Sequence, residues 1–221
     1  MYMLVSHLKK FIYLKTVKSA STTTEIYFQS HCSLRKKVSR KTGQLVDEKG
    51  IIASRGAHSY LSEWHEHMKA AEVKEKIGDD IWNNYFKFCT VRNPYERAVS
   101  WFYFRPHPKD FSEITKDELI EYFESYTMTK FASDREIYCI DGVASMDDYI
   151  KVENFHDDMA RVCSKLEIDW TPETLGHELS HYRPSQSRPK DLFTEESKKH
   201  IRELCAFEIE MFGYRFPHES Y

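Results

Sequence analysis

Two segments of the chain share one pattern, in which an apolar run stops abruptly and the polar start of a helix follows. The first is FIYLKTVKSASTTTEIYF, residues 11–28, and the second is YFKFCTVRNPYERAVSWFYF, residues 85–104. Short apolar runs predict buried strands, and the helical spacing of apolar positions behind them predicts helices. Cations and hydroxyls gather at both junctions, which are therefore candidate anion sites.

The rest of the pattern also alternates between strands and helices. Strands are predicted at residues 10–17, 50–54, 85–91 and 149–152, and helices at residues 21–29, 63–77, 94–104, 116–125, 154–166 and 194–212. Thr194 is the expected N-cap of the last helix, and Gly213 is expected to end it. This alternation predicts an α/β fold with a mostly parallel central sheet flanked by helices. A length of 221 residues predicts a single domain, residues 1–221.

Composition narrows the class of partner. The chain is 41% hydrophobic and 30% charged, with a formal net charge of -3. Proteins that bind nucleic acids are usually more basic, so we expect no nucleic-acid partner and only local anion sites. The basic stretch at residues 33–50 is expected to be solvated surface.

The cysteines and the N-terminus bear on localisation. Five cysteines lie far apart: Cys32, Cys89, Cys139, Cys163 and Cys205. Three of them fall inside predicted core strands or helices, where a buried thiol is expected. This usage indicates a reducing compartment. No apolar run is long enough to span a bilayer, and Lys9 and Lys10 interrupt the short apolar stretch near the start, so no signal peptide is expected. We therefore expect a cytoplasmic protein.

The first junction has the chemistry of a phosphate-binding loop. It reads Lys18, Ser19, Ala20, Ser21, Thr22, Thr23, Thr24. Small residues let the backbone curl around an anion, the following helix N-terminus favours negative charge, and the lysine adds a mobile cation. The nucleotide-kinase pattern GxxxxGK[ST] is absent, and the loop holds no glycine. The alternative interpretation is an ordinary helix N-cap inside a Ser/Thr run.

The second junction is built around Arg92, Asn93 and Pro94. Asn93 is a suitable N-cap, and Pro94 suits the first helical position. Ser100 lies eight residues after Arg92 and is expected to face the same anion. Arg97 lies on the same side, although it is equally able to pair with a carboxylate. The alternative is a capped helix with a surface arginine.

These two motifs together resemble those of sulfotransferases that use 3′-phosphoadenosine-5′-phosphosulfate (PAPS). KSASTTT resembles the 5′-phosphosulfate loop of that family, and VRNPYERAVSWFYF resembles its 3′-phosphate motif. The stretches HMKAAEVKEKIGDDIWNNYFKF, YIKVENFHDDMARVCSKLEID and MFGYRF resemble the carbohydrate-modifying branch. The similarity spans most of residues 10–216, and we expect a P-loop-like, three-layer α/β domain.

The chain departs from the family pattern just before the loop. The family often has a proline before the loop lysine, where this chain has Val17. A second lysine, Lys15, makes a shifted register conceivable. We prefer Lys18, because only this register places the hydroxyl run at the start of the helix.

The resemblance implies a role for each motif. Lys18 would contact the bridging oxygen of PAPS, and the loop residues Ser19, Ala20, Ser21, Thr22 and Thr23 would hold its 5′ end. Arg92 and Ser100 would hold the 3′-phosphate, which distinguishes this donor from ATP. PAPS is the co-substrate, 3′,5′-bisphosphoadenosine (PAP) is the product, and no metal is expected. The implied acceptor is a saccharide hydroxyl, with a phenol, a lipid or a peptide tyrosine as alternatives.

The acceptor hydroxyl needs a general base, and a neutral histidine suits neutral pH. The resemblance places a histidine at His67, which we choose, with His58 second and Glu63 or Glu66 behind them. The alternative is a surface helix that simply carries histidines. The proline-bounded segment RPSQSRP, residues 183–189, is a further candidate, because Arg183, Ser185 or Arg188 would be able to contact the nucleotide.

Two other functions remain open from the sequence. Residues 177–181, HELSH, match the zinc-protease pattern HExxH, but Pro172, Gly176 and Pro184 leave little room for the helix that the pattern needs. The chain could also be a non-catalytic module that binds the nucleotide without turning it over.

Overall fold

The computed structural model describes residues 3–33, 43–54, 56, 58–104, 114–175 and 191–217. The chain divides into two compact units. Unit 1 comprises Met1–Val91 and Asp134–Glu178, and unit 2 comprises Arg92–Ser133 and Leu179–Tyr221.

Unit 1 is built on a sheet whose described part has six strands, in the spatial order β3-β4-β1-β2-β5-β8. These strands are β1 (Leu4–Ser6), β2 (Phe11–Leu14), β3 (Leu45–Asp47), β4 (Gly50–Ile52), β5 (Phe86–Val91) and β8 (Asp148–Lys151). Strands β2, β5 and β8 are parallel to one another, whereas β1 pairs antiparallel with β2 and β4, and β3 antiparallel with β4. A separate hairpin joins β6 (Cys139–Ile140) and β7 (Val143–Ala144).

Connection lengths explain why part of this sheet is antiparallel. Residues 7–10 join β1 to β2, and residues 48–49 join β3 to β4. Connections this short permit only antiparallel pairing, because a parallel crossover needs a dozen or more residues. The predicted parallel strands are thus present as β2, β5 and β8, and the sequence analysis missed β1 and β3.

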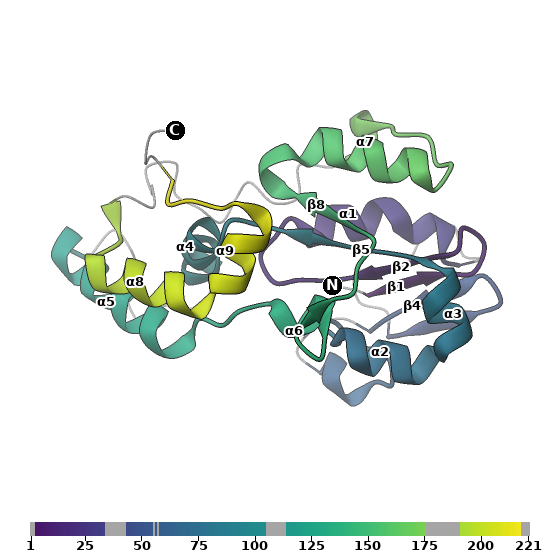
Figure 1. Ribbon diagram of the computed structural model, residues 1–221, viewed down its shortest axis with the longest axis horizontal. Helices are drawn as coiled ribbons and strands as arrows, with labels where there is room; N and C mark the ends of the chain where they lie inside the picture. Colours follow the sequence, from purple (N-terminus) through teal and green to yellow (C-terminus); the bar gives the residue numbers. More distant parts are fainter. Residues whose placement is uncertain are drawn as a thin grey trace. The chain divides into compact units, whose positions relative to one another are not determined.

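Helices cover both faces of the unit 1 sheet (Figure 1). Helices α1 (Ser21–Phe28) and α7 (Phe155–Lys165) lie on one face, and α2 (Ala70–Ile77) and α3 (Asp79–Asn84) lie on the other. The short helix α6 (Arg135–Tyr138) leads into the β6–β7 hairpin. This arrangement confirms the predicted three-layer α/β class.

The helix predicted at residues 63–77 begins only at Ala70. The preceding residues pair with the end of the β4 segment instead, since Ser54 N–H donates to the Trp64 carbonyl at 2.7 Å. Trp64 and Met68 are buried, and His67 has a left-handed backbone with φ 57°. Tertiary pairing and burial therefore override the local helical preference before Ala70.

Unit 2 is helical in its described part. Its helices are α4 (Pro94–Phe104), α5 (Lys116–Lys130), α8 (Glu195–Leu204) and α9 (Ala206–Phe212). They enclose an aromatic-rich core that includes Tyr95, Phe102, Phe123, Phe193 and Phe216. Phe102 and Phe123 pack edge to face, with ring centroids 5.2 Å apart. This packing holds α4, the helix that follows the second junction.

The ends of the last helical segment are as predicted, but its middle is not. Thr194 caps α8 by accepting from the Ser197 N–H at 3.1 Å, and Gly213 ends α9 with φ 69°. Between them the chain forms two helices rather than one, because Cys205 departs from helical geometry with φ -110° and ψ 27°. Its fully buried side chain lies near Arg97, with Sγ and Nη2 3.9 Å apart.

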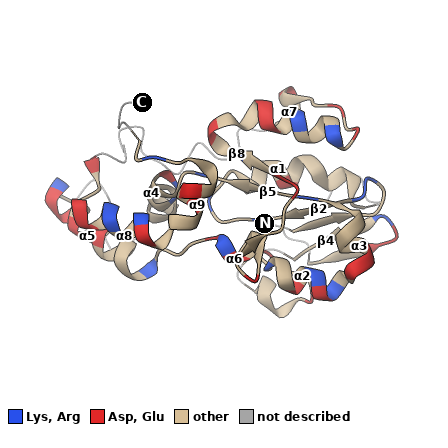
Figure 2. Cartoon of the chain, in the orientation of Figure 1, with Lys and Arg blue, Asp and Glu red and all other residues tan. Residues whose placement is uncertain are grey.

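Other expectations drawn from composition can be compared with the structure. All five cysteines are free and buried, including the three that are expected to be buried thiols. Charged residues of both signs are interspersed on α5 and α8, for example (Figure 2). Among the described residues, no helix is both long and apolar enough to cross a membrane.

Candidate active site

The loop after β2 turns without glycine. Lys18 and Ala20 both have left-handed backbones, with φ 57° and 54°. Such a conformation costs an L-residue roughly 1–2 kcal/mol, because Cβ approaches the following carbonyl. Strained backbone of this kind tends to occur at functional sites, so the loop is a candidate site on conformational grounds as well.

Helix α1 begins without a side-chain cap. Its N-cap residue is Ala20, whose methyl group accepts no hydrogen bond, and the Thr23 N–H reaches back to the Ala20 carbonyl at 3.1 Å. The hydroxyl run is therefore not an ordinary N-cap, which was the alternative interpretation. The helix dipole and the N–H groups of the first turn suit a bound anion.

Thr90 of β5 holds the loop in place. Its Oγ1 lies 3.1 Å from both Ser19 Oγ and Tyr13 Oη, and its carbonyl accepts from Thr16 Oγ1 at 2.5 Å. Ser21 Oγ in turn donates to the Thr16 carbonyl at 2.8 Å. Because Ser19 and Ser21 are buried and make these bonds, their hydroxyls shape the loop, and a ligand would meet their backbone N–H groups.

Other residues of the loop are more accessible. Lys18, Ala20, Thr22 and Thr23 are half-buried. The Val17 N–H donates to Asp134 Oδ2 at 3.0 Å, which anchors the start of the loop to the residue before α6. The predicted donor-binding residues thus divide into an inner set that shapes the loop and an outer set within reach of solvent.

Lys15 is enclosed by protein. Its ammonium lies 2.9 Å from Glu25 Oε2, and neither side chain has any exposed surface. The same ammonium donates to Thr22 Oγ1 at 3.2 Å. Full burial with a carboxylate partner makes Lys15 unsuited to contact a donor molecule, which supports the register that assigns this contact to Lys18.

His67 is seated on the same loop, although it lies 52 residues further along the chain than Lys15. Its Nδ1 is 2.9 Å from the Lys15 carbonyl oxygen. A carbonyl oxygen only accepts hydrogen bonds, so Nδ1 carries a proton and the lone pair of the neutral ring is on Nε2. The ring is thereby set in the tautomer that a general base at Nε2 requires.

Burial lowers the pKa of His67, because desolvation disfavours the imidazolium. The hydrogen bond to Lys15 and the charge of Glu66 partly oppose this shift. Glu66 Oε2 lies 3.8 Å from His67 Nε2, and Glu66 Oε1 accepts from Ser59 Oγ at 3.2 Å. The lowered pKa favours the neutral, basic form of the imidazole.

The other candidate bases lie elsewhere on the preceding segment. His58 is exposed, and its ring lies 6.4 Å from that of Tyr60. Glu63 is also exposed. The structure thus brings His67 to the loop and shows no such contact for His58 or Glu63 among the described residues.

The second junction, in unit 2, has the predicted cap. Asn93 Oδ1 accepts from the Tyr95 N–H at 3.1 Å, and Asn93 Nδ2 donates to the Arg215 carbonyl at 2.7 Å. Arg92 is half-buried, with Nη2 3.4 Å from Glu96 Oε2, and Ser100 is half-buried as well. Glu96, one turn along α4, orients the Arg92 guanidinium in this structure.

Arg97 has a structural role in unit 2. Its side chain is buried, and Nη2 donates to the Ala132 carbonyl at 2.7 Å. The guanidinium carbon also lies 4.5 Å from the centre of the Phe131 ring. These contacts commit Arg97 to packing, which leaves Arg92 and Ser100 as the phosphate-binding candidates.

Comparison with known proteins identifies the class. The sequence profile of the sulfotransferase family matches residues 1–215. The chain belongs to the sulfotransferase family. No curated protein and no solved structure matches it, so membership supports sulfotransfer as its general activity without naming a donor or an acceptor.

Two features predicted from the sequence of this sulfotransferase lie outside the described residues. Arg183, Ser185, Arg188 and the HELSH segment fall within residues 176–190, outside the described residues. In the described ranges, no group of three or more His, Cys, Asp or Glu side chains is arranged to hold a metal ion.

Several residues that build the candidate site were not predicted from the sequence. Thr90, Glu25 and Asp134 each contact the loop from another element. A threonine in a buried strand and an acidic residue in a short helix are common in any α/β protein. Only their contacts with the loop reveal them.

Proposed function

We propose that this sulfotransferase moves a sulfuryl group from PAPS to a hydroxyl of a saccharide and releases PAP. The observation that carries the proposal is the contact between His67 and the loop. A histidine in the tautomer of a general base sits on the carbonyl of Lys15, three residues before the proposed catalytic lysine, Lys18. A merely nucleotide-binding loop does not need a base at this place.

The proposal assigns each end of the donor to one motif. In unit 1, the N–H groups of the first turn of α1, with Thr22 and Thr23, would bind the 5′-phosphate, and Lys18 would contact the bridging oxygen. In unit 2, Arg92 and Ser100 would bind the 3′-phosphate. PAPS and PAP are then the nucleotides that the enzyme distinguishes from ATP and AMP.

The chemistry is an in-line transfer that resembles phosphoryl transfer. His67 Nε2 accepts the proton of the acceptor hydroxyl, whose oxygen forms a bond to sulfur. The bond between sulfur and the bridging oxygen of the 5′-phosphate breaks, and its electron pair remains on PAP. Lys18 stabilises the negative charge that develops on this oxygen.

The saccharide acceptor is proposed on sequence resemblance. The stretches at residues 67–88 and 149–169 resemble the carbohydrate-modifying branch of the family. We also propose that units 1 and 2 act as a single sulfotransferase-like domain, and that the enzyme is cytoplasmic and independent of metal.

Calorimetric titration of the purified protein tests the donor. PAP is expected to bind, and ATP and AMP are expected to bind much more weakly, because neither has a 3′-phosphate for Arg92 and Ser100. Equal affinity for PAP and AMP would contradict the donor assignment. A transfer assay with labelled PAPS and a panel of saccharides, phenols and tyrosine peptides then tests the acceptor. Binding of PAP without transfer to any of them would favour the non-catalytic module.

A further inference from the structure

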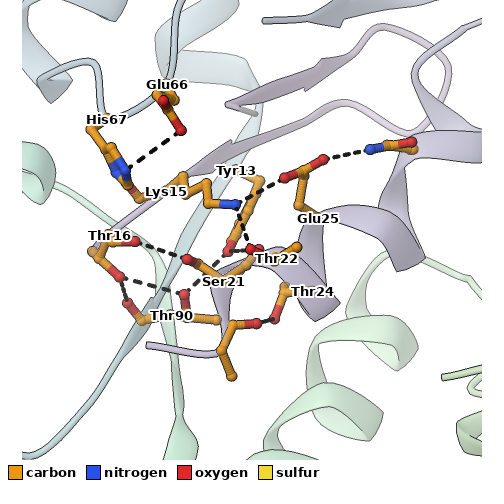
Figure 3. Close-up of polar contacts among 12 residues, drawn as sticks. Tyr13, Lys15, Thr16, Ser21, Thr22, Thr24, Glu25, Glu66, His67 and Thr90 are labelled. Carbon is orange, nitrogen blue, oxygen red and sulfur yellow. Dashed lines mark hydrogen bonds and ion pairs between the residues drawn. The ribbon is translucent and has the colours of Figure 1, made fainter. Parts of the chain in front are cut away.

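A fully buried ion pair lies directly behind the loop of unit 1. Lys15 Nζ is 2.9 Å from Glu25 Oε2 and 3.2 Å from Thr22 Oγ1. Glu25 Oε1 accepts in turn from Gln29 Nε2 at 2.5 Å. The ammonium of Lys15 therefore contacts a carboxylate in the protein interior and a hydroxyl in the first turn of α1 (Figure 3).

The contact with Thr22 decides which way the threonine hydroxyl points. A hydroxyl has one proton to donate and two lone pairs that accept. Because Thr22 Oγ1 accepts from Lys15, one of its lone pairs is occupied and its proton must be directed elsewhere. A threonine near a helix start otherwise tends to give this proton to a nearby backbone carbonyl, which would leave none for a ligand.

We infer that Lys15 is a positioning residue of the sulfotransferase, which orients Thr22 so that its hydroxyl donates to the 5′-phosphate of the donor. This inference rests on the proposed function. Lys15 does not touch the donor, because its side chain is wholly buried. Glu25 makes the arrangement possible, since an ammonium in the protein interior needs a carboxylate partner.

The same residue also reaches the proposed base. The Lys15 carbonyl accepts from His67 Nδ1 at 2.9 Å, so one residue contacts the base through its main chain and the phosphate loop through its side chain. The charge of Lys15 is also one of the smaller causes that lower the pKa of His67. Loss of this charge should therefore act on the pKa of His67 as well as on the orientation of Thr22.

A double-mutant cycle tests the inference by calorimetry with PAP. Lys15→Met/Glu25→Gln removes both charges of this pair together, while Gln at position 25 still accepts from Gln29. Thr22→Val is expected to weaken PAP binding about tenfold in the wild-type background, as for a lost hydrogen bond to a charged group. In the charge-free background the same substitution is expected to change PAP affinity by less than about twofold, because the hydroxyl is no longer oriented.

The pH profile is the second measurement. Lys15 is a minor cause of the lowered pKa of His67, so removing it together with Glu25 is expected to move the acid limb of kcat/KM only slightly, to higher pH. Lys87→Met/Asp147→Asn is the matched control, because it removes an ion pair of 2.8 Å near the start of β5. The control should leave both the Thr22 effect and the acid limb as in the wild type.

The outcomes distinguish a failure of the proposed function from a failure of the positioning role of Lys15. If the wild type fails to bind PAP or to transfer sulfuryl groups, the proposed function is wrong. If the wild type does both but Thr22→Val costs the same in the two backgrounds, Lys15 has no positioning role. Should the charge-free variant not fold, Lys15→Met/Glu25→Leu fills the site with apolar groups and serves for the same cycle.

Discussion

Two lysines three residues apart, Lys15 and Lys18, lie in opposite environments. Lys15 is enclosed with Glu25, whereas Lys18 is half-buried in a loop with a left-handed backbone. Both carry the same charge, so residue type does not separate their roles. Burial separates their roles, because a lysine that pairs with a carboxylate in the protein interior is not available to contact a transferred group.

At this scale the proposal predicts opposite effects at the two junctions. Lys18→Ala is expected to lower kcat roughly 100- to 1,000-fold, as for the loss of one group that stabilises developing charge, with a small change in PAP affinity. Arg92→Ala is expected to weaken PAP binding by roughly 10- to 100-fold and to leave AMP binding unchanged. Steady-state kinetics and calorimetry measure both. Equal effects of both substitutions on kcat and affinity would contradict the assigned roles.

His67 carries a prediction on pH dependence. Its pKa is lowered in the folded protein, so the neutral ring persists below the usual value of 6.5, and activity should be lost only as the pH falls through the lowered pKa. His67→Gln is expected to reduce kcat roughly 100- to 10,000-fold and to remove this acid limb. Kinetics across the acid range measure it, with His58→Gln as the control. A wild-type acid limb that persists in His67→Gln would show that another group titrates.

At the scale of elements, the local sequence pattern correctly predicted the helix ends that are marked by cap residues. Helix α4 begins at Pro94 behind Asn93, and α9 ends at Gly213, as expected. The pattern did not predict the extended residues before Ala70 or the break at Cys205. In both places the chain contacts a distant segment, through Ser54 in one case and Arg97 in the other.

The strained loop gives a prediction about stability. Ala20 has φ 54°, so Ala20→Gly removes steric strain and is expected to raise the free energy of unfolding by about 0.5–1 kcal/mol. Ala160→Gly, in the middle of α7, is the matched control and is expected to lower it by about 0.5–1 kcal/mol. Urea unfolding measures both. A loss of stability in Ala20→Gly would mean that the left-handed backbone is not strained.

At the scale of the whole molecule, the proposed function requires that the two units bind the same donor molecule. Unit 1 contains the first loop and His67, and unit 2 contains Arg92, Ser100 and the aromatic core around α4. The family profile covers both units with one match, residues 1–215. We expect one domain, because the proposed donor uses residues from each.

Hydrogen exchange with PAP tests this expectation. PAP at about 100 times its dissociation constant adds about 2.7 kcal/mol to a state that binds it. Amides of α1 in unit 1 and α4 in unit 2 are both expected to exchange more slowly with PAP. AMP is the control and should protect α1 alone, since it lacks the 3′-phosphate. Protection of only one unit by PAP would contradict a shared donor site.

The sequence by itself determined the α/β class, the two strand-to-helix junctions and the residue types that suit a phosphosulfate donor. These features follow from local spacing, because the period of apolar positions and the chemistry of caps act over a few residues. The tertiary structure alone decided that Lys15 is enclosed with Glu25, that Thr90 holds the loop, and that His67 sits on the Lys15 carbonyl. Burial and hydrogen bonding between segments many residues apart arise only when the chain packs, and they set the charge, tautomer and orientation on which the proposed chemistry depends.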